Sequence, residues 1–334
     1  MTFEELKLRR LQGQHLLQKT DTQTVVKDLC GIQAQYLSHA LHALSIRCQQ
    51  VDTTDLVKSW TNRGTMHLFS EADLPLFLYR GRPHHLRPVD TMESDACVDA
   101  SRKAYFASVI LEQIASGIEE RDVLRAACEA EGMNAEEAES IFNPWGGLLR
   151  ALCEEGHICH QVQEKKSFRL CPPFEPMDAR AAQTELLRRY FTNFGPATVR
   201  DASYFFGWPQ SRIKALMTEL PLEAFGLEGR IYYHISGQSP ATDIPACLFL
   251  AGFDQLLLGY EKTENPFLPQ AHIRDIFTLA GSVRPAVLVD GTVAGSWNLK
   301  GKNLTVTLFA DADPAVLTEQ ARILWPELNR ITVE

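Results

Sequence analysis

One pattern recurs three times along the chain and constrains its fold more than any other feature: a group of short amphipathic helices is followed by a strand or a hairpin. Apolar residues at helical spacing predict the helices, and alternation of apolar and polar residues predicts the strands. This succession is typical of a winged-helix module. We therefore expect three such modules in residues 1–240.

The first repeat is predicted to contain four helices and then a strand. The second helix follows a capping residue, Asp21 or Thr22, and ends near Gly31. Leu56, Val57 and Trp60 would share one face of the fourth helix. The predicted helices cover residues 3–19, 21–31, 40–46 and 52–60, the strand covers residues 64–69, and a further helix opens at Glu71.

The second and third repeats follow the same order. The hairpin of the second repeat turns at Glu164-Lys165-Lys166, and Thr198 and Gly207 would cap the two ends of one helix in the third. The predicted helices cover residues 102–118, 121–131, 143–152, 181–194, 198–206 and 209–220, and the strands lie within residues 157–163, 167–171 and 222–236.

The last part of the chain, residues 241–334, changes to a β-rich pattern. Asp290-Gly291 between two apolar runs is a strong hairpin signal. We expect a small β-barrel covered by one helix, which makes the whole chain an α+β protein. The predicted strands cover residues 246–251, 285–289, 292–297 and 303–309, and the helix covers residues 313–325.

The composition is that of an ordinary globular protein, with 45% hydrophobic and 22% charged residues in 334. No apolar run is long enough to span a membrane and no secretory signal opens the chain, so we expect a cytoplasmic protein. The eight cysteines form no Cys-x-x-Cys pair and are interpreted as buried thiols. Cys153, His157, Cys159 and His160 do not match a structural zinc spacing, and His84-His85 is interpreted as an exposed loop pair.

The acidic charge is concentrated in one segment. The net charge is −9, and residues 91–140 hold 4 basic and 12 acidic side chains, a net of −8. A net acidic protein argues against a simple nucleic-acid binder, but the rest of the chain is close to neutral and can be locally basic. A surface that faces DNA is therefore permitted, with the acidic segment turned away from it.

Two glutamines near the N-terminus form a candidate site. Gln33 and Gln35 are separated by Ala34 and follow Gly31, a plausible helix cap. On a helix their side chains would diverge by about 200°, whereas on an extended backbone they point the same way. The pair could present two amides to one cleft. The alternative is an ordinary pair of solvated side chains, which are common.

Blocks of sequence spread over nearly the whole chain resemble one protein family. The blocks are Gly31-Ile32-Gln33-Ala34-Gln35, Asn62-Arg63-Gly64-Thr65-Met66-His67-Leu68, Asp73-Leu74-Pro75, Gly195-Pro196-Ala197-Thr198-Val199-Arg200-Asp201, Phe253-Asp254-Gln255-Leu256-Leu257-Leu258-Gly259-Tyr260 and residues 287–297. In this order and spacing, they resemble the AlkZ/YcaQ family of bacterial winged-helix DNA glycosylases.

The resemblance implies a fold and a site. The fold is three tandem winged-helix modules at residues 1–95, 96–176 and 177–240, followed by a β-barrel domain at 241–334, in a C-shaped body around DNA. In the family, a glutamine–apolar–glutamine or glutamine–apolar–aspartate motif carries catalysis. Here Gln33, Ala34 and Gln35 occupy it, as in the AlkZ-like branch.

The resemblance also implies the substrate and the setting. Family members excise N7-alkylated purines, and some unhook interstrand crosslinks. We expect double-stranded DNA with alkylated purines as the partner, no cofactor or nucleotide, no membrane, and a bacterial, nucleoid-associated monomer.

Two amides suit this chemistry although neither is basic. Glycosidases normally need two carboxylates, one of which protonates the leaving group. An N7-alkylguanine is already cationic and leaves as a neutral base, so no general acid is needed. Amide oxygens can then hold a water molecule and stabilise an oxocarbenium-like sugar. The same pair should be poor at excising uncharged bases.

Basic residues of each repeat are candidate DNA contacts. Arg63 and His67 flank the first strand, and their alternative is a structural arginine and a half-buried histidine. The second hairpin offers Lys165, Lys166 and Arg169, which can equally be solvated. A helix of the third repeat carries Arg212 and Lys214, where a recognition helix would read DNA; that helix could also be purely structural.

Two functions from different classes fit the sequence. The first is a monofunctional DNA glycosylase for N7-alkylpurines or their crosslinks. The second is a winged-helix transcription regulator without catalytic activity, because winged helices more often regulate than cut.

Overall fold

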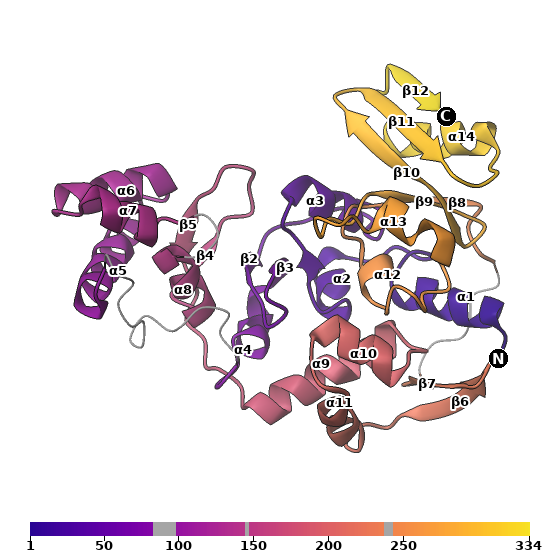
Figure 1. Ribbon diagram of the computed structural model, residues 1–334, viewed down its shortest axis with the longest axis horizontal. Helices are drawn as coiled ribbons and strands as arrows, with labels where there is room; N and C mark the ends of the chain where they lie inside the picture. The colour runs from indigo at the N-terminus through magenta and orange to yellow at the C-terminus, as the bar shows by residue number, and fades with distance from the viewer. Residues whose placement is uncertain (83–97, 144–146, 237–242) are drawn as a thin grey trace. The chain divides into compact units, whose positions relative to one another are not determined.

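A computed structural model describes residues 1–82, 98–143, 147–236 and 243–334 as a mixed α+β protein (Figure 1). Its internal contacts divide it into two compact units, residues 1–52 with 184–334 and residues 53–183. The predicted loop pair His84-His85 and the predicted helix start at Pro144-Trp145 lie outside the described residues. The division into winged-helix modules stays a prediction.

The first unit begins with three helices, α1 (Phe3–Gly13), α2 (Thr22–Asp28) and α3 (Leu37–Ser45), with the short β1 (Ile32–Gln33) before α3 (Figure 1). The side chain of Thr2 starts α1 in a capping box with Glu5, and Asp21 caps α2 as predicted. Helix α1 ends at Gly13, earlier than expected, and His15 just beyond it has a φ of 57°, outside the helical range. Gly13 lies against the carbonyl of Asn193, where a Cβ atom would come within 2.3 Å.

The same unit continues with most of α9 (Ala179–Asn193). After it come α10 (Val199–Phe206), α11 (Gln210–Met217) and a hairpin formed by β6 (Glu223–Leu227) and β7 (Arg230–His234). The predicted caps of α10 are confirmed. Thr198 caps its start with Asp201, and Gly207 ends it with a φ of 68°.

The C-terminal strands form an open sheet rather than the expected barrel. Their order is β12-β11-β10-β9-β8, with β8 and β12 as unpaired edges among the described residues, so the barrel prediction is wrong. One face of this sheet is occupied by α14, whose Leu317 and Ala321 pack into a core with Trp297. Helix α14 therefore buries this face of the sheet although the sheet does not close into a barrel. The elements are β8 (Cys247–Leu250), α12 (Gln255–Leu258), α13 (Ile273–Ile276), β9 (Ala286–Val289), β10 (Thr292–Lys300), β11 (Asn303–Leu308), α14 (Pro314–Leu324) and β12 (Arg330–Val333).

The second unit contradicts one predicted helix. Residues 56–60 form a strand, β2 (Leu56–Trp60), paired antiparallel with β3 (Met66–Ser70). The turn between them contains Gly64 with a φ of 72°. The three apolar residues of this segment, Leu56, Val57 and Trp60, are too few for periodicity to separate helix from strand, and the β-hairpin pairing decided the outcome.

The remaining elements of the second unit are helices around a small sheet. The hairpin of β4 (Ile158–His160) and β5 (Phe168–Leu170) is confirmed, and β4 pairs with β2. Helix α7 (Ala135–Ile141) was not predicted, although Asn134 and Glu137 form a capping box that signals it. The other helices are α4 (Leu74–Phe77), α5 (Ala100–Ala115), α6 (Arg121–Ala130) and α8 (Gly147–Glu155). None of the helices described is both long and apolar enough to cross a membrane.

Candidate active site

The chain leaves α2 in an extended conformation at Ile32–Gln33, as predicted, and bends at Gln35 and Tyr36. Cys30 and Gly31 both have positive φ, 53° and 79°, and the Gly31 N–H donates to the Val26 carbonyl at 2.7 Å, which closes the helix end. Ile32 and Ala34 are then buried, at 1% and 0% exposure. This turn directs the chain straight from the helix into the extended segment.

The two glutamine side chains differ in exposure but share one property. Gln33 is 8% exposed and Gln35 is exposed. Neither side-chain amide hydrogen-bonds to any of the residues that the structure describes. Although Gln33 is largely buried as a residue, its amide atoms keep some contact with solvent, because neither belongs to the fully buried polar atoms without a partner. The pair is therefore available to a ligand.

The carbonyl of Gly31 is held by a residue from the far end of the chain. Gln255, at the start of α12, donates its amide to the Gly31 oxygen at 3.2 Å and is completely buried. Its neighbour Asp254 accepts two hydrogen bonds from Arg47, at 3.0 and 2.7 Å, and both side chains are 0% exposed. Asp254 also caps α12. A buried ion pair thus fixes the loop that anchors the glutamine segment.

Aromatic rings lie beside this segment. Tyr36 directly follows Gln35, and its ring stacks on Phe253, with centroids 5.9 Å apart and planes 24° apart. The His39 ring meets Tyr36 edge-on at 6.0 Å. Burial lowers the pKa of His39 from its usual value, so its imidazole is neutral near pH 7. The surroundings of the glutamine pair are therefore aromatic and uncharged on this side.

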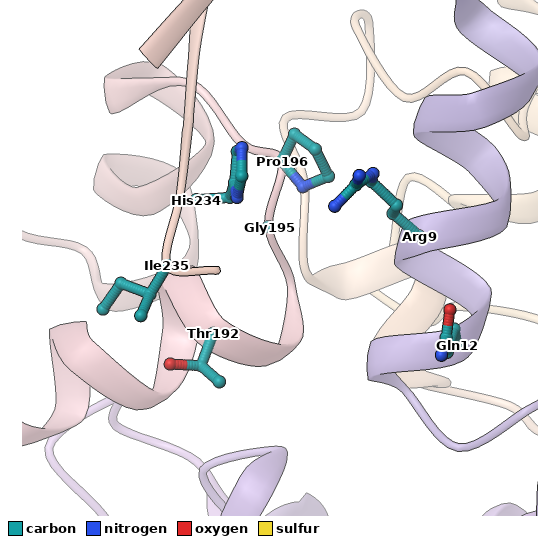
Figure 2. A pocket seen from close by; sticks show the side chains of 7 residues that line it. All are labelled: Arg9, Gln12, Thr192, Gly195, Pro196, His234 and Ile235. Carbon is teal, nitrogen blue, oxygen red and sulfur yellow. The ribbon is translucent and has the colours of Figure 1, made fainter. Parts of the chain in front are cut away.

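A hollow in the same unit is not lined by the glutamine pair. Figure 2 shows Arg9 of α1 pointing towards Pro196 and His234, with Gln12 and Thr192 nearby. Its volume is about 40 Å³. Small-molecule sites measure roughly 300–1,000 Å³, so this hollow is too small for a nucleobase.

A buried polar network lies next to that hollow. The guanidinium of Arg10 donates to the Pro196 carbonyl at 2.8 Å, lies 3.5 Å from Asp201 and sits 3.8 Å from the centre of the Tyr260 ring. Gln14 donates to the Tyr260 hydroxyl at 3.1 Å. These contacts join α1 to the loop after α12, and we interpret them as structural.

Arg63 and His67 form a pair in the second unit. The His67 side chain is 0% exposed, and Arg63 donates to its Nε2 at 3.0 Å. Burial and the Arg63 charge lower the pKa of His67 to about 3, so the ring is neutral, and its Nδ1 donates to the Thr65 carbonyl at 3.0 Å. His67 therefore orients the Arg63 side chain. Because His67 is buried, it can influence DNA binding only through Arg63 and not by touching DNA itself.

The basic residues of the β4–β5 hairpin differ in their partners. Lys165 pairs with Glu120 at 2.5 Å, and Arg169 pairs with Glu71 at 2.5 Å. Lys166 is exposed. Two of the three predicted DNA contacts are thus already matched by carboxylates.

Arg212 and Lys214 lie on α11 in the same unit as the glutamines. Both side chains are exposed, and neither forms an ion pair within the described part of the chain. They are therefore free to attract phosphate. Their roles, like those of the other predicted contacts, stay predictions.

A family model described as "DNA glycosylase AlkZ-like" matches residues 26–331. The chain belongs to the AlkZ-like DNA glycosylase family. The match begins before Gln33 and ends in β12, so it includes both units. Membership makes this AlkZ-like protein an enzyme, a DNA glycosylase, and not the transcription regulator that the sequence also allowed.

Two relatives agree with this assignment. The chain is 27% identical, over 91% of its own length and 90% of the relative's, to a protein of Streptomyces sahachiroi named "Interstrand DNA cross-link repair glycosylase". It also resembles the solved structure of "Streptomyces sahachiroi DNA glycosylase AlkZ", with a TM-score of 0.77, 22% identity, and coverage of 100% and 99% of the two chains. The second likeness shows that the AlkZ-like fold is shared.

Sequence reasoning missed the residues that hold the glutamine segment in place. Phe253, Asp254 and Gln255 were part of a block that resembled the AlkZ-like family, but nothing assigned them a role. A buried aspartate followed by a buried glutamine is unusual for polar side chains. Only their contacts with Arg47 and Gly31 show what they do.

Proposed function

We propose that this AlkZ-like enzyme hydrolyses the N-glycosidic bond of cationic N7-alkylated purines in double-stranded DNA, with Gln33 and Gln35 as its catalytic pair. The observation that carries the proposal is the segment 31–35, extended at Ile32–Gln33, whose two glutamine amides make no hydrogen bond to the described residues. Unpaired polar groups in a fixed, partly enclosed position are suited to binding a ligand.

The amides act by position and electrostatics. The alkylated base carries its positive charge before the bond breaks, so it departs as a neutral molecule without a proton donor. Positive charge then develops on the sugar, and amide oxygens stabilise it while holding the attacking water. Gln35 is exposed and reaches the sugar and the water, whereas Gln33, at 8% exposure, offers its amide from the enclosed side.

We extend the proposal to interstrand crosslinks and to a monomeric enzyme. The named activity of the 27% identical relative supports crosslinks as substrates. A crosslinked base cannot be extruded easily into a closed pocket, in contrast to the bases that most glycosylases flip. Contacts with the DNA backbone then supply most of the affinity, from Arg63, Lys166, Arg212 and Lys214 among others.

The test is excision from a duplex that contains one 7-methylguanine, followed by alkali cleavage at the abasic site. Gln35→Ala should reduce the single-turnover rate by roughly a hundredfold, the usual effect of removing one group that stabilises transition-state charge. DNA binding and unfolding temperature should stay unchanged, because Gln35 is exposed and makes no hydrogen bond to the described residues.

The matched control is Gln210→Ala, which removes an exposed glutamine at the start of α11 in the same unit. It should leave the rate unchanged. Equal excision by wild type and Gln35→Ala would refute the glutamine mechanism. A rate on uracil equal to that on 7-methylguanine would refute the requirement for a cationic base.

A further inference from the structure

An exposed aromatic residue directly follows the proposed catalytic pair in the chain. Tyr36 follows Gln35 in the chain and precedes α3, and 55% of its surface is exposed. Large aromatic side chains normally bury most of their surface, because each carries a large apolar area. Tyr36 makes no cap hydrogen bond to α3. Its exposed ring therefore has no evident role in holding the fold.

The ring of Tyr36 packs against Phe253, a residue in a strained backbone conformation. Phe253 stacks on Tyr36 and has a φ of 58°. A bulky aromatic residue rarely adopts this left-handed backbone, which costs free energy. Such strain persists only where the surrounding structure enforces it, and it concentrates at functional sites.

The neighbours of Phe253 enforce that conformation. Its N–H donates to the Val283 carbonyl at 3.2 Å, and the next residue, Asp254, is fixed by the buried Arg47. On the other side, a Cβ atom on Gly252 would lie only 3.0 Å from the His39 ring. The loop 252–255 is therefore closely packed under the segment that carries Gln35, and it holds the Phe253 ring against Tyr36.

The chemistry of the ring suits the proposed substrate. The face of an aromatic ring is negative and attracts a cation, and nucleobases stack on aromatic side chains. The nearest ionisable ring, His39, has its pKa lowered by burial and carries no competing charge near pH 7. The other polar side chains of the segment, Gln33 and Gln35, are uncharged amides.

We infer that Tyr36 is a substrate-binding residue that stacks on the cationic alkylated base next to Gln35, and that Phe253 positions its ring. The inference rests on the proposed function, because it assigns the leaving base a binding surface. It adds selectivity in substrate binding to the selectivity of the glutamines in the chemical step, since the ring face binds a charged base more strongly than an uncharged base of the same shape.

The test compares two lesions of nearly identical shape. One duplex carries 7-methylguanine on a 2′-fluoro sugar that resists hydrolysis, and the other carries uncharged 7-methyl-7-deazaguanine. Wild type should bind the first duplex more tightly. Tyr36→Leu should reduce that preference by roughly twofold to thirtyfold, the range expected from the loss of one cation–π contact. Tyr36→Phe should retain it, because the ring is kept.

Two further variants distinguish a direct contact of Tyr36 with the base from the positioning of its ring by Phe253 and from a general effect on folding. Phe253→Leu removes the supporting ring and should lower the preference less than Tyr36→Leu does. Tyr204→Leu is the matched control, because Tyr204 is an exposed tyrosine of the same unit, at 38%, on α10. It should change neither the preference nor the excision rate. The unfolding temperatures of all four variants are measured alongside.

The outcomes distinguish this inference from the proposed function. If wild type prefers the cationic lesion and Tyr36→Leu keeps that preference, the inference is wrong even where 7-methylguanine is excised. If the preference depends on Tyr36 but wild type excises nothing, the stacking surface stands and the catalytic proposal fails. If wild type shows no preference for the cationic lesion, the inference is refuted.

Discussion

The side-chain amide of Gln255 donates a hydrogen bond to the carbonyl oxygen of Gly31, 224 positions away in the sequence, at 3.2 Å. This bond ties the loop after β8 to the start of the segment that carries Gln33 and Gln35. Gln255 is completely buried, and its Oε1 has no partner among the described residues. Among the described residues, the side chain of Gln255 thus makes one hydrogen bond, and that bond positions the glutamine segment.

Replacement of Gln255 by Met should lower activity more than stability. The variant keeps the approximate volume but leaves the Gly31 carbonyl without its partner, which costs about 1–3 kcal/mol. Freed from its anchor, the segment should hold the two amides less accurately, and small misplacements are costly in catalysis. Excision rates and urea unfolding measured on the same preparation check this. A variant with full activity would show that Gln255 is only a packing residue.

Arg47→Met should strongly destabilise the protein. The Arg47–Asp254 pair is 0% exposed on both sides, so the variant leaves an uncompensated buried carboxylate. Removing one partner of such a pair costs about 3–5 kcal/mol. Urea unfolding measures the loss, and the double variant Arg47→Met with Asp254→Leu should recover part of it. A double variant less stable than Arg47→Met would contradict this account.

His67 should make the protein less stable as the pH falls. Its pKa is lowered to about 3 in the folded state, whereas an unfolded histidine titrates near 6.5. Between these values the unfolded state binds a proton that the folded state does not, so the free energy of unfolding falls below pH 6.5. At pH 5 the contribution is a loss of about 2 kcal/mol relative to pH 8.

The check is urea unfolding at pH 8 and pH 5 for wild type and His67→Gln. The glutamine keeps a hydrogen-bonding side chain without titrating in this range, so the difference between the two pH values should shrink in the variant. An unchanged difference would show that other groups cause the acid sensitivity.

Salt dependence should separate free basic residues from paired ones. Arg212 and Lys214 are exposed and form no ion pair in the described residues, whereas Arg169 is paired with Glu71. If both α11 side chains contact phosphate, each alanine variant should reduce the slope of log affinity against log salt by about 0.9. Arg169→Ala should change the slope less. The measurement is duplex binding between 50 and 200 mM salt, a span in which roughly 6–10 phosphate contacts change affinity by several orders of magnitude.

Equal slopes for wild type and both α11 variants would remove this helix from the DNA-binding surface. That result would favour the structural alternative for α11, whose Ile213 and Leu216 are buried in the unit's core.

Local signals in the sequence were strong where capping residues and turns act within a few positions. Asp21, Thr198 and Gly207 marked helix ends correctly, and Asp290-Gly291 marked the hairpin of β9 and β10. The helix predicted at residues 52–60 was wrong because three apolar residues are too few to distinguish a helical period from a strand period, and only the pairing with β3 decided between them. The prediction of a barrel was wrong because the closure of a sheet depends on long-range strand pairing, which no local sequence pattern encodes.

The sequence by itself determined the family, the α+β class and the extended exit from α2 that carries Gln33 and Gln35, because these follow from residue order and local backbone preference. The tertiary structure alone decided that Gln33 is enclosed while Gln35 is exposed, that His67 is buried and neutral, and that Gln255 and Phe253 support the glutamine segment. Burial and contacts between residues more than 200 positions apart depend on how the chain packs, and residue spacing does not contain that information.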